Sequence, residues 1–462
     1  MTTVQFVSSI SASPTVRLAL NTGPWTLHAS RTDLSPPDLR MARVSTLLAD
    51  GENIPASAYA NRILRLGLTL STASTDLAAT QLQALFRELN RKNNILKWHP
   101  AGATSPVFFR TFRASSEAVR VVRGHQLHEI DVDIEAEPFA VGLLETLSLE
   151  TVTNNPATGC FFDIAAAEIK GDVETPLIMT IPYADVSGFG PSAFAVRRTG
   201  TPSATPLFLQ AESATLGTGA TLPGNDALMS GSGSNYARIS FGTPTMVDRL
   251  LFGVHPASAS VDARGRYRVL ARYRKNTSTD VINMRLKVHT GGTAYTNTTV
   301  ACASGTTNIR YADLGTVQIP VGTDPVYDGL SGSERAARGA VVTLMAERTS
   351  GAGTLDVDVL VWMPCDSYGE ITWPSTSGPT SMVFDGAADS VYPIGGSGEV
   401  FHREPLPRSA GPVMVNPNQD ARVFFLLNAN GLASTISDSI TSDVDITPSY
   451  YPLYLFVRPA TT

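Results

Sequence analysis

The sequence predicts a mainly β protein built as several β-sandwich domains. Short runs of alternating apolar and polar residues recur along the chain, and clusters of Gly, Pro, Asn, Asp and Ser separate them. Alternation with a period of two places every second side chain on the same face of a strand. Many short strands with turn residues between them are typical of sandwiches and barrels. The length of 462 residues corresponds to roughly three domains.

Three runs give the clearest strands. Residues 62–70 carry leucine at every second position, and residues 284–290 alternate apolar side chains with Arg285, Lys287 and His289. In residues 355–363 the odd-numbered positions are all apolar. Each run therefore predicts a strand with one face turned toward a core.

One segment has helical periodicity instead. Between residues 75 and 91 the apolar positions recur at i, i+3, i+4 and i+7: Leu82, Leu85, Phe86 and Leu89. Ser74 or Thr75 can cap the first turn, where Asp76 is also favourable. This segment predicts one α-helix over 75–91 that packs on a sheet.

Two composition changes divide the chain. A strand over 126–137 closes an N-terminal unit, and the stretch 374–379 is rich in Pro, Ser, Thr and Gly, as linkers are. Residues 149–206 could belong to either neighbour. The predicted domains are a β domain with one helix (1–148), a β-sandwich (149–375), and a C-terminal β domain or set of returning strands (376–462).

Composition excludes several classes of protein. The net charge of −6 lacks the basic excess of a nucleic-acid binder. No apolar run is long enough for a membrane-spanning helix, and the first twenty residues lack the pattern of a secretory signal. Cys160, Cys302 and Cys365 are too few and too widely spaced for a disulfide framework, so we expect buried free thiols.

No catalytic motif stands out. The chain has no G-x-S-x-G, no P-loop and no H-E-x-x-H. The glycine-rich stretch 217–234 does not fit a phosphate-binding loop and predicts a surface loop. The sequence thus predicts no enzyme, and no cofactor or metal site.

An acidic stripe follows one face of the strand that ends the N-terminal unit: Asp131, Asp133, Glu135 and Glu137. Like charges at this spacing repel unless other groups offset them. The stripe could form an inter-subunit seam or a cation site. A solvated face that discourages wrong strand pairing is the simpler interpretation.

A second charged strand covers residues 265–274, in which four arginines share a face. This face could bind phosphate or acidic sugars. We favour an exposed sheet face whose arginines pair with acids on neighbouring strands.

Paired carboxylates occur at Asp356 and Asp358, and strict alternation gives them the same face as Trp362. Trp362 and Trp373 could stack on a sugar, so these four residues are the candidate glycan contacts. A glycosidase using Asp356 or Asp358 is a further hypothesis. Packing in a core or interface is the alternative for the tryptophans.

The N-terminal 148 residues resemble the belt domain of siphophage distal tail proteins and minor tail proteins. The resemblance follows the leucine-rich strand 62–70, the helix that begins at Asp76, the run Asn94-Ile-Leu-Lys-Trp-His-Pro, the strand from Pro106, and Ala136-Glu-Pro-Phe-Ala. The C-terminal run from Ser449 also resembles tail-protein endings. The middle region resembles jelly-roll carbohydrate-binding modules, through the strands at 265–272, 311–320 and 353–364.

This resemblance implies a structural subunit of a phage tail tip. Such a protein forms a ring, usually of six copies, that joins the tail tube to the tip or baseplate, and is assembled in the bacterial cytoplasm. Its partners are further copies of itself, the tail tube and other tip proteins, and host-surface glycan through the jelly roll. The alternative is a carbohydrate-binding protein whose main role is host glycan recognition.

Overall fold

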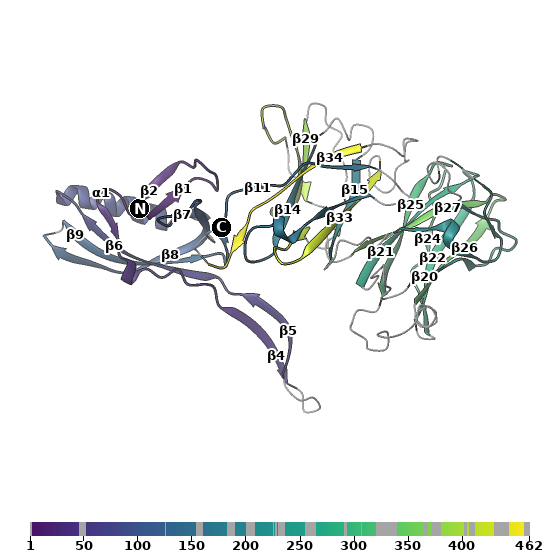
Figure 1. Cartoon of the computed structure of the whole chain (residues 1–462), viewed down its shortest axis with the longest axis horizontal. Coiled ribbons are helices and arrows are strands. Elements are labelled where there is room, and N and C mark those ends of the chain that lie inside the picture. The colour runs from purple at the N-terminus through teal and green to yellow at the C-terminus, as the bar shows by residue number, and fades with distance from the viewer. Residues whose placement is uncertain are drawn as a thin grey trace. The chain divides into compact units, whose positions relative to one another are not determined.

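The mainly β fold is confirmed in a computed structural model of the chain (Figure 1). It separates into two compact units: residues 1–145, 169–175 and 450–462 form the N-terminal unit, and residues 146–168 and 176–449 form the C-terminal unit. The structure describes residues 2–456 apart from 46–51, 125, 154–159, 183–189, 200–207, 225, 227–228, 230–235, 255–264, 291–292, 306, 320–339, 365–367, 371–379, 402–403, 406–411 and 429–442.

A nine-stranded, nearly closed antiparallel sheet forms the N-terminal unit. Its main path runs β2-β1-β7-β8-β9-β6-β3, and β10 joins β8 to β35. The C-terminal strand β35 therefore completes this sheet. The bounds are β1 Thr3–Val7, β2 Val16–Ala19, β3 Trp25–Leu27, β6 Arg62–Ser71, β7 Asn94–His99, β8 Val107–Arg123, β9 Leu127–Ala136, β10 Ala140–Val141 and β35 Leu453–Tyr454.

The core of this sheet follows the alternation that the sequence predicts. The leucines of β6 at positions 64, 66, 68 and 70 are buried, as are the even-numbered residues 130–136 of β9. The odd-numbered residues of both strands face the other side, where Arg65, Asp131 and Asp133 lie. The helix α1 (Thr75–Leu89) packs Leu85 and Leu89 into the same core.

The helix itself is confirmed within two residues. The Ser74 hydroxyl accepts a hydrogen bond from the Leu77 amide, and Asp76 lies in the first turn. The helix ends at Leu89, and Asn93 adopts a φ of 51° four residues later. Asparagine is among the residues that adopt such left-handed backbone most readily.

A two-stranded ribbon leaves this sheet. It consists of β4 (Leu39–Ser45) and β5 (Glu52–Tyr59), which pair with each other alone among the described strands. Figure 1 shows it projecting from the end of the sheet at which β6 begins. The opposite end of the sheet carries the turn between β8 and β9.

Two six-stranded sheets pack on a common apolar core in the C-terminal unit. One has the main path β18-β19-β27-β21-β25, with β16 on β27; the other has β17-β20-β26-β22-β23, with β24 on β22. The bounds are β16 Phe208–Gln210, β17 Thr215–Leu216, β18 Ala220–Thr221, β19 Ala237–Ile239, β20 Val247–Val254, β21 Gly265–Lys275, β22 Val281–Thr290, β23 Thr293–Thr296, β24 Val300–Ala301, β25 Arg310–Ile319, β26 Ala340–Ser350 and β27 Leu355–Pro364.

An eight-stranded and a four-stranded sheet complete the described strands. The eight-stranded sheet contains β11 Glu145–Thr146, β12 Glu150–Thr153, β14 Thr175–Pro182, β29 Ser381–Asp385, β30 Ser390–Ile394, β31 Glu404–Pro405, β32 Met414–Val415 and β34 Asp443–Tyr450. The four-stranded sheet contains β13 Cys160–Ile164, β15 Gly190–Thr199, β28 Tyr368–Glu370 and β33 Asp420–Asn428.

A β-bulge in β27 breaks the alternation predicted for residues 355–363. Arg272 of β21 pairs with Val359, but the next residue, Tyr273, pairs with Val357, so Asp358 is an extra residue in its strand. A bulge of this kind shifts the side chains beyond it by one position. The expectation that all five odd-numbered residues share one face is therefore wrong.

Candidate functional site

The acidic stripe on β9 is offset by cations and an amide of the same chain. Among the described residues its partners are Arg31 for Asp131 at 3.4 Å, Arg65 for Asp133 at 3.4 Å, Asn61 for Glu135 at 2.9 Å, and Arg110 for Glu137 at 3.6 Å. These pairs are partly exposed, and each contributes only about 0–1 kcal/mol. They remove the repulsion expected from the bare stripe. The inter-subunit seam stays a prediction.

Gly67 on β6 makes one of these pairings possible. A Cβ at this position would lie 2.4 Å from the Cβ of Arg31, far inside van der Waals contact. The missing side chain lets Arg31 lie across the sheet and reach Glu129 at 3.1 Å as well as Asp131.

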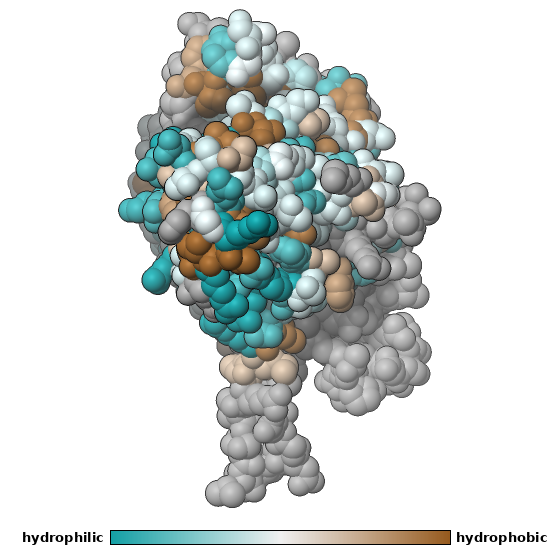
Figure 2. Space-filling view, turned by 90° about the vertical axis from the view of Figure 1, so that its left-hand side faces the viewer, coloured by the Kyte–Doolittle hydropathy of each residue, from teal (hydrophilic) through white to brown (hydrophobic). Residues whose placement is uncertain are grey.

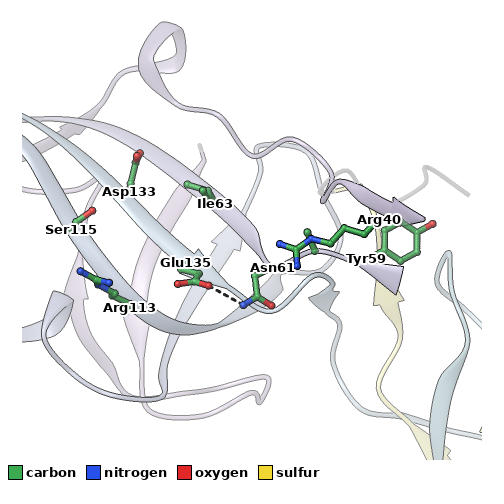
Figure 3. Close-up of a pocket in the computed structure, with 9 residues that line it drawn as sticks. Arg40, Tyr59, Asn61, Ile63, Arg113, Ser115, Asp133 and Glu135 are labelled. Atoms are coloured by element: carbon green, nitrogen blue, oxygen red, sulfur yellow. Dashed lines mark hydrogen bonds between the residues drawn. The ribbon is translucent and has the colours of Figure 1, made fainter. Parts of the chain in front are cut away.

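A cavity of about 520 Å³ lies where the ribbon leaves the sheet (Figure 3). The ribbon contributes Arg40 and Tyr59, and the sheet contributes the acids Asp133 and Glu135. The other residues that line it are Ala60, Asn61, Ile63, Arg113 and Ser115. Both signs of charge are present, so the cavity suits a polar protein segment better than a single small ion. In the part of the chain that the structure describes, no three His, Cys, Asp or Glu side chains gather as a metal site.

The second half of β8 is an unpaired sheet edge. β7 pairs with β8 only up to Thr111, whereas β9 continues alongside it as far as Arg123. Residues 112–123 therefore lack a second neighbour among the described strands. Their exposed apolar side chains are Phe112, Val119, Val121 and Val122. An edge of this length with apolar side chains is a template for another strand.

The ribbon β4–β5 is the second unpaired feature of this unit. Leu39 and Met41 of β4 are 48% and 39% exposed, respectively. An isolated two-stranded ribbon is at best marginally stable in water, so it needs a surface to pack on. Figure 2 shows the side of the molecule that lies at the left of Figure 1, where hydrophobic patches alternate with hydrophilic side chains.

Sequence reasoning missed this ribbon, although a signal was available. Asp50-Gly51 stands between its two strands, and this dipeptide is typical of tight hairpin turns. A Pro-rich and Asp-rich segment precedes the first strand and obscures the pattern.

Asp356 and Asp358 are both fully buried and ion-paired. Arg238 approaches Asp356 at 2.7 Å and Arg274 approaches it at 3.0 Å, while Arg272 contacts Asp358. Arg272 and Arg274 of β21 thus pair with acids, as the sequence predicts. The expectation of an exposed face is wrong for Arg272, of which only 2% is accessible.

Two described residues of the stretch predicted as a surface loop contact this face. Met229 is fully buried, and its carbonyl oxygen accepts a hydrogen bond from Arg272. Asp226 accepts one from Arg274 at 2.7 Å. A glycan would have to displace these contacts to reach either Asp356 or Asp358.

Trp362 does not lie beside the two aspartates. Trp362 lies opposite Val269 of β21, and its side chain is on the other face of the sheet from the two aspartates. Its ring meets that of Tyr267 edge-on, with 5.6 Å between the ring centroids. Only 3% of the side chain is exposed. Trp373 lies outside the described residues. The glycan contacts proposed for these four residues stay predictions.

Two further expectations concern cysteines and membranes. Cys302 is a buried free thiol, and burial raises its pKa to about 12. Cys365 lies outside the described residues. Within the described ranges, no helix is long and apolar enough to cross a membrane.

No protein-family model and no curated protein matches the chain. Solved structures similar to the chain at low scores include the following three. The SPP1 Dit protein, described as a paradigm of hub adsorption apparatus in phages that infect Gram-positive bacteria, has a TM-score of 0.25 at 9% identity and covers 78% of this chain and 99% of its own. The phage P2 baseplate in its activated conformation has a TM-score of 0.26 at 8% identity. The match covers 78% of this chain and 98% of the baseplate chain. A particle of IBDV, an icosahedral virus, has a TM-score of 0.17 at 9% identity. The match covers 67% of this chain and 78% of the viral chain. TM-scores this low establish neither fold nor function for this chain.

Proposed function

We propose that this chain is a structural subunit of a bacteriophage tail tip, a distal or minor tail protein without catalytic activity. Its N-terminal unit forms a closed ring of six copies that joins the tail tube to the tip or baseplate. The observation that carries the proposal is the pair of unpaired β features on this unit, the edge 112–123 of β8 and the ribbon β4–β5. The sequence resemblance to belt domains supports it independently.

These two features are different parts of the same unit: they meet at the cavity, where Arg113 and Ser115 of β8 lie beside the ribbon, and the edge then runs away from the ribbon. The ribbon leaves beside Arg62, which pairs with Ala136 at the end of β9, whereas the edge of β8 runs toward the turn that precedes Leu127. One copy therefore offers an open edge and a free ribbon at different places. When different patches of identical subunits meet, the contact is head-to-tail. Such contacts form a ring where the rotation between neighbouring copies closes, and an open filament where it does not.

If the ribbon of one copy paired with the edge of β8 in the next copy, both unpaired features would gain a hydrogen-bonding neighbour. Added strands bind through main-chain hydrogen bonds, with side chains supplying specificity. The exposed Leu39 and Met41 of the ribbon and Val121 of β8 would then be buried in the contact. The cavity at the base of the ribbon offers polar side chains to the rim of the same interface.

Glycan recognition by the C-terminal unit is the second candidate function. The observation in its favour is the sandwich of two six-stranded sheets, the architecture of the modules that the sequence resembles. A glycan array probed with the full chain tests it. Binding to a defined sugar is expected, and an empty array would contradict this role.

A charge on the open edge tests the ring. Lysine on an edge strand discourages pairing, so Val121→Lys should leave the protein monomeric under conditions in which the unaltered protein assembles. Val281 provides a matched control, because it is 47% exposed on β22 against 50% for Val121. Val281→Lys should assemble normally. Equal assembly of both variants, with far-UV circular dichroism of the unaltered protein, would contradict a ring built through β8.

A further inference from the structure

A partly buried cluster of charges in the C-terminal unit lies outside the proposed ring. It consists of Arg238, Arg272, Arg274, Asp226, Asp356, Asp358 and Glu212. The arginines come from β19 and β21, two of the aspartates come from β27, Glu212 follows β16, and Asp226 lies in the stretch before β19. Among the described residues, three guanidinium groups therefore face four carboxylates.

Two carboxylate oxygens of this cluster lack a partner. Oδ1 of Asp358 and Oε2 of Glu212 are both inaccessible to solvent, and neither forms a hydrogen bond within the described structure. The other oxygen of Asp358 is held by Arg272. An ionised oxygen without a partner is costly in a protein interior. The cluster has more carboxylates than guanidinium groups, and the two oxygens without a hydrogen-bond donor reflect this shortage of positive charge.

We propose that this cluster binds one proton when the pH falls from neutral to mildly acidic, and that Asp358 shares this proton-binding role with Glu212. The proton converts an unpaired carboxylate oxygen into a hydroxyl and balances the three arginines. It thereby removes the surplus negative charge from the face on which Arg272 and Arg274 hold Met229 and Asp226.

The titration of Asp358 is consistent with this geometry. Its pKa is raised to about 6, first by burial and further by the charges of Glu212 and Asp226, against the opposing effect of Arg272. Burial also raises the pKa of Glu212. Arg238, Arg274 and Asp356 complete the charged groups around this face, and Tyr236 lies against both of those arginines.

The sign of the pH effect follows from these directions. A carboxyl whose pKa is higher in the folded than in the unfolded state binds more protons when folded. The free energy of unfolding therefore rises as the pH falls through about 6, and the gain is complete near the unfolded pKa of 3.8. Above pH 7 the cluster holds its surplus charge.

Thermal unfolding of the full chain between pH 7.5 and 5 tests the proposal. Glu212→Gln removes the surplus charge but takes no partner from any of the three arginines. We expect the melting temperature of the C-terminal unit to rise by roughly 2–4 °C at pH 7.5, to change little at pH 5, and to depend less on pH than in the unaltered protein. Histidine titration contributes equally to both proteins, so it cancels from the comparison.

Glu347→Gln is the matched control. Glu347 lies on β26 and accepts a hydrogen bond from Asn283, which glutamine can also accept. Its pH profile should equal that of the unaltered protein. Asp358→Asn, a neutral analogue of the protonated carboxyl, should flatten the profile and melt near the temperature of the unaltered protein at pH 5. Unchanged profiles for Glu212→Gln and Asp358→Asn, or a destabilised Glu212→Gln at pH 7.5, would overturn the proposal.

Discussion

Two arginines keep one buried carboxylate ionised in the N-terminal unit. Glu88 of α1 is only 5% exposed yet accepts hydrogen bonds from Arg17 at 2.9 Å and Arg91 at 3.0 Å. Burial alone would raise its pKa, but the two guanidinium groups outweigh burial and lower it. The ionised form is therefore part of the native fold.

Replacing Glu88 with glutamine should destabilise the N-terminal unit by about 2 kcal/mol at pH 7, because charge-assisted hydrogen bonds are lost. The effect depends on pH. A carboxyl with a lowered pKa contributes stability above its unfolded pKa of 4.5, and this contribution is lost as the pH falls through the folded pKa. Urea unfolding at pH 7 and pH 3 should show the difference shrinking in acid. An equal difference at both pH values would contradict this role.

Individual residues also show where prediction from the sequence succeeds and where it fails. Alternation placed Met284, Leu286 and Val288 inward, and all three are fully buried. The same rule misplaced Trp362, because one extra residue at Asp358 reverses every position beyond it. A period of two contains no information about where a bulge occurs. The burial of Arg272 depended on Met229, which is 43 residues away in the sequence.

At the scale of elements, local signals predicted α1 well. The apolar spacing, the cap and the first-turn aspartate all lie within the helix and its flanks, so no tertiary contact was needed to recognise it. The closing strand β35 is the opposite case. It pairs with β10 across more than 300 residues of chain, and its membership of the N-terminal unit depends on that distant partner.

The cap of α1 gives a prediction at this scale. Ser74→Ala removes the acceptor for the Leu77 amide, 3.2 Å away, and should cost about 1 kcal/mol of stability. Ser74→Asp should restore most of the loss, since aspartate also caps and its charge suits the helix N-terminus. Denaturant midpoints of the three proteins measure both effects. Equal loss in the alanine and aspartate variants would show that the cap is not the cause.

At the scale of the whole molecule, the open edge of β8 and the ribbon β4–β5 have no partner among the described strands of their own chain. The sequence resemblance predicted a ring, but it could not name the contact surfaces, because an unpaired edge is a property of the folded sheet. The acidic stripe was the surface that sequence alone suggested. In the structure its charges are offset within the subunit.

The mass distribution of the purified full chain, measured by mass photometry together with negative-stain images of the same sample, tests the ring most directly. The proposal predicts closed rings whose mass is six times 49.1 kDa. Monomers alone, both in isolation and after mixing with assembled tail tubes, would contradict the central claim.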